Sequence, residues 1–217
     1  MQREPTGRRE PLTRERIVDA AIGVADAGGL EAVSMRRLAH ELGVAAMSLY
    51  HHVEGKDAVL DGMVDRLVDA IESPVDPSDW KATLRGRAHA GRALFRRHAW
   101  APALLATRSS TSRAIVRYLD AVARIFLDGG FSHQLTHTAT HVLDSRILGF
   151  PSGILEPGDT GPVLDDAFIA DLRAGRYPTL AELLVDIHHD GDAEFDIAFD
   201  LILDGLERAR DRERAEA

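Results

Sequence analysis

The sequence predicts an all-α protein of two domains, and three observations support this fold class. Nine prolines leave the stretches 12–73, 103–150 and 179–217 free of proline, which breaks helix interiors. Apolar residues recur there at helical spacing, and alternating strand patterns are absent. Two of these prolines fall within 73–77 and separate one helix from the next. We therefore predict one domain over residues 12–72 and a second over residues 78–217.

Composition excludes several classes of protein. The chain has 217 residues, 45% of them apolar and 28% charged, as in ordinary globular proteins. It has no cysteine, which excludes disulfides, zinc fingers, iron–sulfur clusters and thiol catalysis. No apolar run approaches the roughly 18 residues of a membrane helix, and the N-terminus is polar. We expect a cytoplasmic protein with no membrane partner. The net charge of −9 argues, taken alone, against a nucleic-acid partner.

The first domain is predicted to contain four short helices. Thr13 precedes apolar residues at helical spacing, and Gly28-Gly29 ends that helix. Ser34 is a suitable N-cap for a helix over residues 35–41, and a short third helix follows over residues 45–52. A fourth begins near residue 55 and carries one apolar stripe, composed of Leu60, Met63, Val64, Leu67, Val68 and Ile71.

The second and third of these helices have the spacing of a helix-turn-helix. A turn of about three residues surrounds Gly43, where a left-handed backbone is needed. Ala39 is small enough to let the two helices approach, and Leu49 fills the angle between them. A capped helix before the turn and a periodic helix after it strengthen the prediction.

The run SMRRLAHELGVAAMSLYHHVEGKDAVLDGMVD, residues 34–65, resembles the DNA-binding domain of the TetR family of bacterial transcriptional regulators. The C-terminal part resembles the tetracycline repressor's own subgroup through Trp80, Ala106-Thr107-Arg108, residues 129–132 and residues 195–207. The resemblance implies a homodimer that binds double-stranded operator DNA and is released by a small-molecule effector. Repression rather than activation is part of that implication.

The resemblance also implies which residues contact DNA, with the third helix in the major groove. The predicted contacts are Arg36, Ala46, Met47, Ser48, Tyr50, His51, His52 and Lys56. Arg36 can pair with guanine, and Ala46 and Met47 can contact thymine methyl groups. Tyr50, His52 and Lys56 match positions that hold the DNA backbone. Tyr50 as a core residue and His52 as a helix-end hydrogen-bonding group are the alternatives.

Residues 1–11 form a basic arm before the first helix. Arg3, Arg8 and Arg9 lie in it, and it can follow DNA or remain a solvated tail. Residues 1–53 contain seven arginines and seven acids, so the net charge of −9 comes from residues 54–217. The overall acidity therefore does not exclude a DNA-reading surface in the first domain, and it favours salt-sensitive, sequence-dependent binding.

The second domain is predicted to contain helices over residues 79–97, 112–127, 133–148 and 193–210, with a long loop over 149–162. The last helix has two apolar faces, Phe195, Phe199, Ile202 and Leu206 on one and Ile197 and Leu201 on another. A helix with two apolar faces must be covered twice, and a partner subunit is the simplest second cover. In the family the third and fourth of these helices form the dimer interface, which predicts a palindromic operator.

The resemblance places the effector pocket in the second domain. Aligned on Trp80, the drug-binding and metal-binding residues of the tetracycline repressor correspond to Arg87, Gly91 and Leu104. These three residues cannot hold a magnesium–tetracycline complex. We therefore expect a different ligand, apolar or anionic, and no cofactor. A solvated surface role is the alternative for Arg87.

A stripe of histidines on the third helix of this domain allows two interpretations. His133, His137 and His141 share one face, with Asp144 beside them. Such a set can bind zinc or nickel or titrate as a pH sensor. The simpler interpretation is a polar seam in the dimer interface, so no metal site is predicted.

Two other functions compete with DNA binding. A helical metal-dependent enzyme is the first, but the Glu-x-x-His and HExxH motifs, a glycine-rich phosphate loop and a Gly-x-Ser-x-Gly elbow are all absent from the sequence. An adaptor that kept the helix-turn-helix shape without reading DNA is the second. We predict a regulator and not an enzyme.

Overall fold

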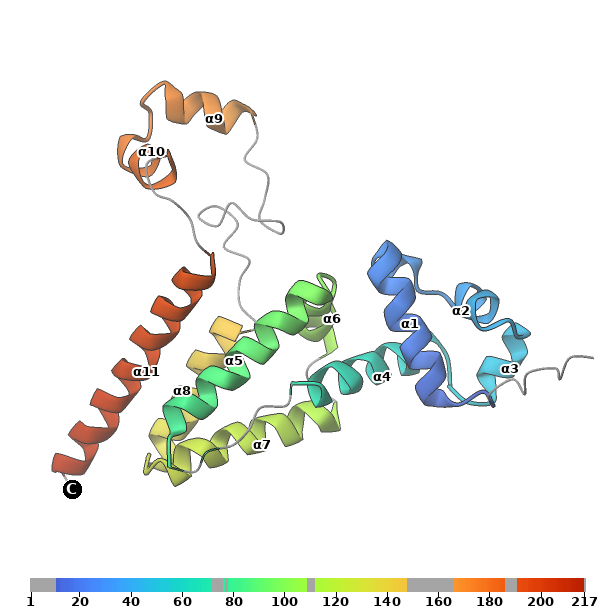
Figure 1. Ribbon diagram of the computed structural model, residues 1–217, viewed down its shortest axis with the longest axis horizontal. Helices are drawn as coiled ribbons and strands as arrows, with labels where there is room; N and C mark the ends of the chain where they lie inside the picture. Colours follow the sequence, from blue (N-terminus) through green and yellow to red (C-terminus); the bar gives the residue numbers. More distant parts are fainter. Residues whose placement is uncertain are drawn as a thin grey trace, which may run out of the picture. The chain divides into compact units, whose positions relative to one another are not determined.

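The computed structural model describes residues 11–71, 76, 78–108, 112–147, 166–185 and 191–216, and all its regular elements there are helices (Figure 1). The all-α prediction is confirmed. Residues 1–10 of the predicted arm and the predicted loop at 149–162 lie outside the described residues. The chain forms two compact units, residues 1–72 with 90–118, and residues 73–89 with 119–217. Helices α5 (Trp80–Arg97) and α7 (Arg113–Asp128) contribute to both units.

In the first unit, α1 (Arg14–Gly28) begins and ends where the sequence predicts. The Thr13 hydroxyl accepts a hydrogen bond from the Arg16 amide at 3.2 Å, which satisfies one of the free amides of the first turn. The chain then leaves the helix at Gly29 and makes one turn of 3-10 helix, η1 (Leu30–Ala32).

The helix-turn-helix consists of α2 (Met35–Leu42) and α3 (Ala46–Tyr50). Ser34 caps α2 by accepting from the Arg37 amide at 3.2 Å. Gly43 has φ +64° and ψ +36°, the left-handed conformation that glycine adopts at the least steric cost. The Gly43 and Val44 amides donate to the carbonyls of His40 and Ala39, closing the end of α2. The predicted turn is therefore confirmed.

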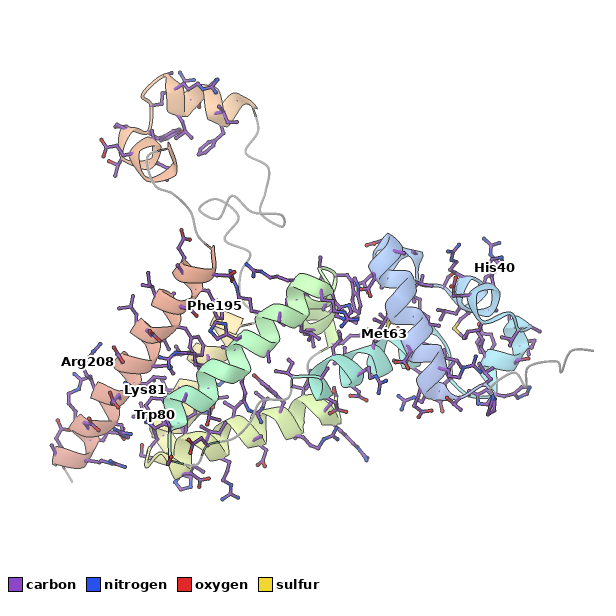
Figure 2. All side chains as sticks on the ribbon, viewed as in Figure 1. His40, Met63, Trp80, Lys81, Phe195 and Arg208 are labelled. Atoms are coloured by element: carbon purple, nitrogen blue, oxygen red, sulfur yellow. The ribbon has the colours of Figure 1, made fainter. Side chains whose placement is uncertain are left out.

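Helix α4 (Lys56–Asp69) packs against α1, and its predicted apolar stripe faces the core. Met63 lies between these two helices (Figure 2) and is fully buried. Gly62 lets them approach closely, because a Cβ atom there would lie 2.6 Å from Cγ2 of Val18. One core therefore joins the helix-turn-helix to α1 and α4, and its largest fully buried side chains are Ile17, Leu38, Leu49, Met63, Val33, Val59 and Val64.

Helix α6 (Ala101–Arg108) is absent from the sequence prediction. Pro102 lies in its first turn, where a missing amide hydrogen costs nothing. The connection from α5 into α6 is tied to the end of α1 by one carboxylate: Oδ1 of Asp26 lies 2.7 Å from Nδ1 of His98 and accepts from Nε1 of Trp100 at 2.7 Å. This pairing holds α6 in the first unit.

In the second unit, α8 (His133–Ile147) packs with α11 (Gly191–Glu216). The inner face of α11 is completely or nearly completely buried at Phe195, Phe199, Leu203 and Leu206. The sequence predicted Ile202 on this buried face, but Leu203 is the residue buried there and Ile202 is half-buried. An aromatic cluster of Trp80, Phe126 and Phe131 closes the adjoining core, with the Trp80 and Phe131 ring centroids 4.9 Å apart.

Two further short helices lie within this unit, α9 (Asp166–Arg173) and α10 (Pro178–Val185). They contact each other, and the Phe168 and Tyr177 rings stack with centroids 6.1 Å apart. Neither helix was predicted from the sequence. Across the described part of the chain, no helix has the length and apolarity needed to span a membrane.

Candidate nucleic-acid interface

On α3 one side chain is buried in the core, and the others are exposed or half-buried. Leu49 is fully buried, whereas Met47 is 70% exposed. Ala46, His51 and His52 are exposed as well. A methionine so exposed on a five-residue helix contributes little to the folded core.

Tyr50 and Ser48 extend this surface. Tyr50 is 49% exposed, so its phenol is available outside the core and the alternative of a mainly buried tyrosine is wrong. Ser48 is half-buried, and its backbone amide donates to the carbonyl of Ala45 at 2.9 Å. Serine and tyrosine hydroxyls both donate to phosphate oxygens in protein–DNA interfaces.

The predicted cationic contacts come from the helices on either side of α3. Arg36 is exposed on α2, and Lys56 is exposed at the first residue of α4. The first turn of a helix carries free amides and a partial positive charge, which favour a phosphate near Lys56. The exposed histidine that Figure 2 labels on α2, His40, also belongs to this helix-turn-helix. Every predicted DNA contact is thus exposed or half-exposed, and all eight come from one continuous stretch of the first unit.

Behind α3, helix α4 carries four aspartates at four-residue spacing, which we call the α4 ladder: Asp57, Asp61, Asp65 and Asp69. Arg108 on α6 binds Asp57 and also donates to Asp61 at 2.7 Å. The Ser112 hydroxyl donates to Asp65 at 2.6 Å, and Arg117 on α7 donates to Asp69 at 2.9 Å.

The four-residue spacing of the aspartates can be seen in the sequence, but the residues that pair with them cannot be identified from it. The hydrogen bond to Asp61 has the largest effect on the pKa of Arg108 and raises it above the usual value. Burial opposes this shift, and the hydrogen bond to Asp57 adds to it. This arginine is only 23% exposed at its side chain, which makes the pair stronger than a fully solvated one. The ladder joins the helix that begins at Lys56 to α6 and α7.

A second charge ladder fastens α11 to α5, and we call it the α5–α11 ladder. Lys81 donates to Asp204 at 2.8 Å and to Glu207 at 2.5 Å. One turn on, Arg85 binds Asp200. The next turn places Nε2 of His89 2.8 Å from Asp196. Figure 2 shows Lys81 and Trp80 at the beginning of α5, beside α11.

The ladder leaves another face of α11 uncovered. Ile197 is 61% exposed and Leu201 is 66% exposed, one helical turn apart. Val142 on α8 is also exposed. The predicted second apolar face of α11 therefore lies open in the single chain.

The three predicted effector contacts are not grouped in one unit. Arg87 belongs to the second unit and Gly91 and Leu104 to the first, where Leu104 is 2% exposed within the core. Arg87 borders a hollow of about 140 Å³ in the second unit. Three apolar and four charged residues line the hollow: Asp76, Trp80, Arg87, Ala121, Arg124, Ile125 and Asp128.

The histidine stripe on α8 lies on an exposed face. His133, His137 and His141 are all exposed, while Thr136 and Leu143 are buried on the other side of the helix. Among the side chains that the structure describes, no group of three or more potential metal ligands is present.

Comparison with known proteins agrees with this arrangement. Residues 17–63 match the family described as "Bacterial regulatory proteins, tetR family", and residues 73–210 match "Tetracyclin repressor-like, C-terminal domain". The HTH-type transcriptional repressor DrrR1 of Streptomyces coeruleorubidus is 33% identical over 95% of this chain and 81% of its own length. Both parts of the sequence resemblance are thereby confirmed.

Solved structures give the same result for the fold. Apo ActR from Streptomyces coelicolor superposes with a TM-score of 0.76 at 28% identity, covering 94% of this chain and 98% of that one. ActR in complex with actinorhodin gives 0.73 at 27% identity, covering 92% and 99%. The exposed helix-turn-helix, the charge-tied helices behind it and these likenesses lead to one assignment, a DNA-binding transcriptional regulator and not an enzyme. The chain belongs to the TetR family.

Proposed function

We propose that this protein is a homodimeric repressor that binds a palindromic operator through α3 and leaves it when a small molecule binds the second unit. The observation that carries the proposal is the exposed surface of α3 with Met47 and Tyr50, flanked by Arg36 and Lys56. Apolar, hydroxyl and cationic groups on one helix-turn-helix suit base edges and phosphates together. A regulator of this kind acts on the chromosome, in the cytoplasm.

Two features support the dimer. Ile197 and Leu201 form an apolar strip along α11 that the chain itself leaves open, and Val142 is exposed on α8, the helix that packs with α11. A second copy would cover the strip with the same strip, as two-fold symmetry requires. Two α3 helices would then read two half-sites about one helical turn of DNA apart.

The α4 ladder supports control of DNA binding by the rest of the chain. Lys56 begins α4, and the aspartates that follow along that helix are held by α6 and α7. A shift of α6 or α7 therefore alters the position of the helix that follows α3. Repression released by a ligand needs such a physical connection between two states.

The hollow beside Arg87 is the candidate site for the effector. Arg87 and Arg124 line it with Trp80 and Ile125, and Asp76 and Asp128 balance the two arginine charges, so a mostly apolar molecule with an acidic group directed toward Arg87 matches this lining. At about 140 Å³ it holds a small molecule or one end of a larger one. ActR, a relative, has been solved with actinorhodin bound. An Arg87→Met variant should then lose the thermal stabilisation that an aryl carboxylate effector gives the wild type, while keeping operator affinity.

The deciding experiment is selection of bound DNA from a random pool by the full-length protein. We expect enrichment of one palindrome, which would support the dimer, the function and the recognition helix together. Enrichment of no sequence would overturn the proposal.

Two variants then separate the roles of the cations on the selected operator. Lys56→Ala should weaken binding to all sequences and lower the slope of log affinity against log salt by about one. Arg36→Ala should cost about 1–3 kcal/mol and relax preference at one base position only. Equal losses on every sequence from both variants would count against the assigned roles, as would unchanged binding in both. A wild type that retains no DNA in the selection would favour the adaptor.

A further inference from the structure

The imidazoles of His137 and His141 on α8 have no role in reading DNA or in the α5–α11 ladder. Their ring centroids lie 4.6 Å apart with the planes at 87°. Both side chains are exposed, on the side of α8 away from the buried Thr136, Ala139 and Leu143. We infer that these two side chains bind one divalent transition-metal ion, of which Zn²⁺ is the probe that we commit to.

The separation of the rings fits a shared ion. An imidazole nitrogen binds zinc at about 2.0–2.1 Å, so the centre of the ring lies about 3.2 Å from the metal. Two centres 4.6 Å apart then subtend an angle of about 90° at the ion, close to the angles of tetrahedral and octahedral coordination. The four-residue spacing places both rings on one face of α8, within reach of one ion.

Neutral imidazole is a good ligand for zinc, copper and nickel, whereas calcium and magnesium prefer oxygen. The hydroxyls of Thr138 and Thr140 are engaged with carbonyls of their own helix, those of Gln134 and Thr136. The described side chains offer no third ligand nearby, so water completes the coordination. This site is independent of the proposed effector hollow, whose lining contains no histidine.

The test is a Zn²⁺ titration of tag-free, full-length protein by calorimetry, compared with His137→Gln and His141→Gln. We expect one ion per chain at the tightest site and more than about tenfold weaker binding in either variant, since even second-shell losses cost ten- to hundredfold. Two matched controls, His133→Gln one turn earlier on α8 and His40→Gln on α2, should bind Zn²⁺ as the wild type does. DNA binding should be unchanged in the three variants on α8, so the outcome does not depend on the proposed repressor function.

Wild-type affinity in the His137→Gln, His141→Gln double variant would overturn the inference, as would loss of binding in His133→Gln but not in His141→Gln. A second measurement needs no variant. Imidazole resonances of the wild type should respond to Zn²⁺ as a pair, those of His137 and His141 shifting at the same metal ratio. A shift confined to other histidines would equally overturn the assignment.

Discussion

Helices α3 and α11 both expose large apolar side chains, but they do so in different surroundings. Met47 on α3 stands alone between groups that can hydrogen-bond, among them Ser48 and Tyr50. Ile197 and Leu201 on α11 follow one another along a strip, and the neighbouring aspartates are turned to α5 and paired there. One surface mixes chemistries, and the other is continuous and apolar.

The difference teaches what each surface can bind. A continuous apolar strip of a long helix suits another apolar strip, because burial of both removes apolar area from water. A single methionine among hydroxyls, imidazoles and cations suits DNA, where methyl groups, base edges and phosphates alternate. Exposed fraction alone does not distinguish the two, since Met47 and Leu201 differ by only a few percent, at 70% and 66%.

The largest expected effect comes from charging the apolar strip. Ile197→Asp with Leu201→Asp should raise the Kd of the dimer more than about 100-fold, because unpaired buried carboxylates cost several kcal/mol and 1.4 kcal/mol is a factor of ten. Sedimentation velocity measures the mass of the species in solution, and operator affinity should fall as the dimer dissociates. Val116→Asp is the matched control, since Val116 is 64% exposed on α7 outside the strip. A double variant that remains a dimer would contradict the comparison.

The next largest effect concerns the packing of α1 against α4, the helices that support the helix-turn-helix. Gly62→Ala forces a Cβ atom against Val18 and should lower the free energy of unfolding by about 1–3 kcal/mol. Urea unfolding followed by circular dichroism measures it. Gly23→Ala on α1 is the control: a Cβ atom there meets nothing within 4 Å, so stability should rise by about 0.5–1 kcal/mol. If both substitutions stabilise, α1 and α4 are not packed as closely as described.

A smaller effect should follow from truncating the isolated methionine. Met47→Ala should weaken operator binding by about 1–2 kcal/mol, within the usual cost of one lost base contact. Fluorescence anisotropy with operator and scrambled duplexes measures both affinities, and only the operator affinity should change. The unfolding midpoint should be unaffected, since the side chain is 70% exposed. Loss of dimer mass in this variant would mean that α3 and α11 do not differ as stated.

The smallest effect concerns pH at the α5–α11 ladder, which orients the apolar strip. Hydrogen bonding to Lys81 lowers the pKa of Asp204 below 3.8, and hydrogen bonding to Asp204 raises the pKa of Lys81 above 10.5. The pair therefore stabilises the fold between those two pH values. Its contribution is lost as pH falls through the lowered pKa of Asp204, or rises through the raised pKa of Lys81.

A Lys81→Met variant checks this assignment. The difference in urea midpoint between wild type and variant should be constant near neutral pH and shrink below about pH 4. A difference that stays constant down to pH 2 would show that packing of the Lys81 stem, and not its charge, carries the effect. Arg212→Met, at an exposed position of α11 and not among the charges that lower the pKa of Asp204, is a control expected to change little.

Local signals explain why the first unit was predictable. Thr13, Ser34 and Gly43 determine helix ends through their own hydrogen bonds or dihedral angles, which depend on near neighbours in sequence. The exposure of the predicted DNA contacts followed from placing Leu49 in the core. Their individual roles remain predictions.

The second unit was less predictable because its determinants are distant in sequence. Lys81 pairs with Asp204, 123 residues away, and no spacing rule identifies such partners. Short helices were missed where proline was read only as a breaker: Pro102 and Pro178 each lie in the first turn of a helix, a position proline tolerates. The effector contacts followed from the family resemblance alone and remain predictions as well.

The chain has two tryptophans, and the compact units contain one each. Trp80 is 9% exposed among phenylalanine rings, with the Arg210 guanidinium 5.8 Å from its ring centroid. Trp100 is half-buried in the other unit, with its indole NH bound to Asp26. The molecule thus carries a separate fluorophore in each half, one in an apolar setting and one beside a carboxylate. Replacing either with phenylalanine would leave an optical signal from a single unit, so that an effector's arrival in one half and the response of the other could be timed independently.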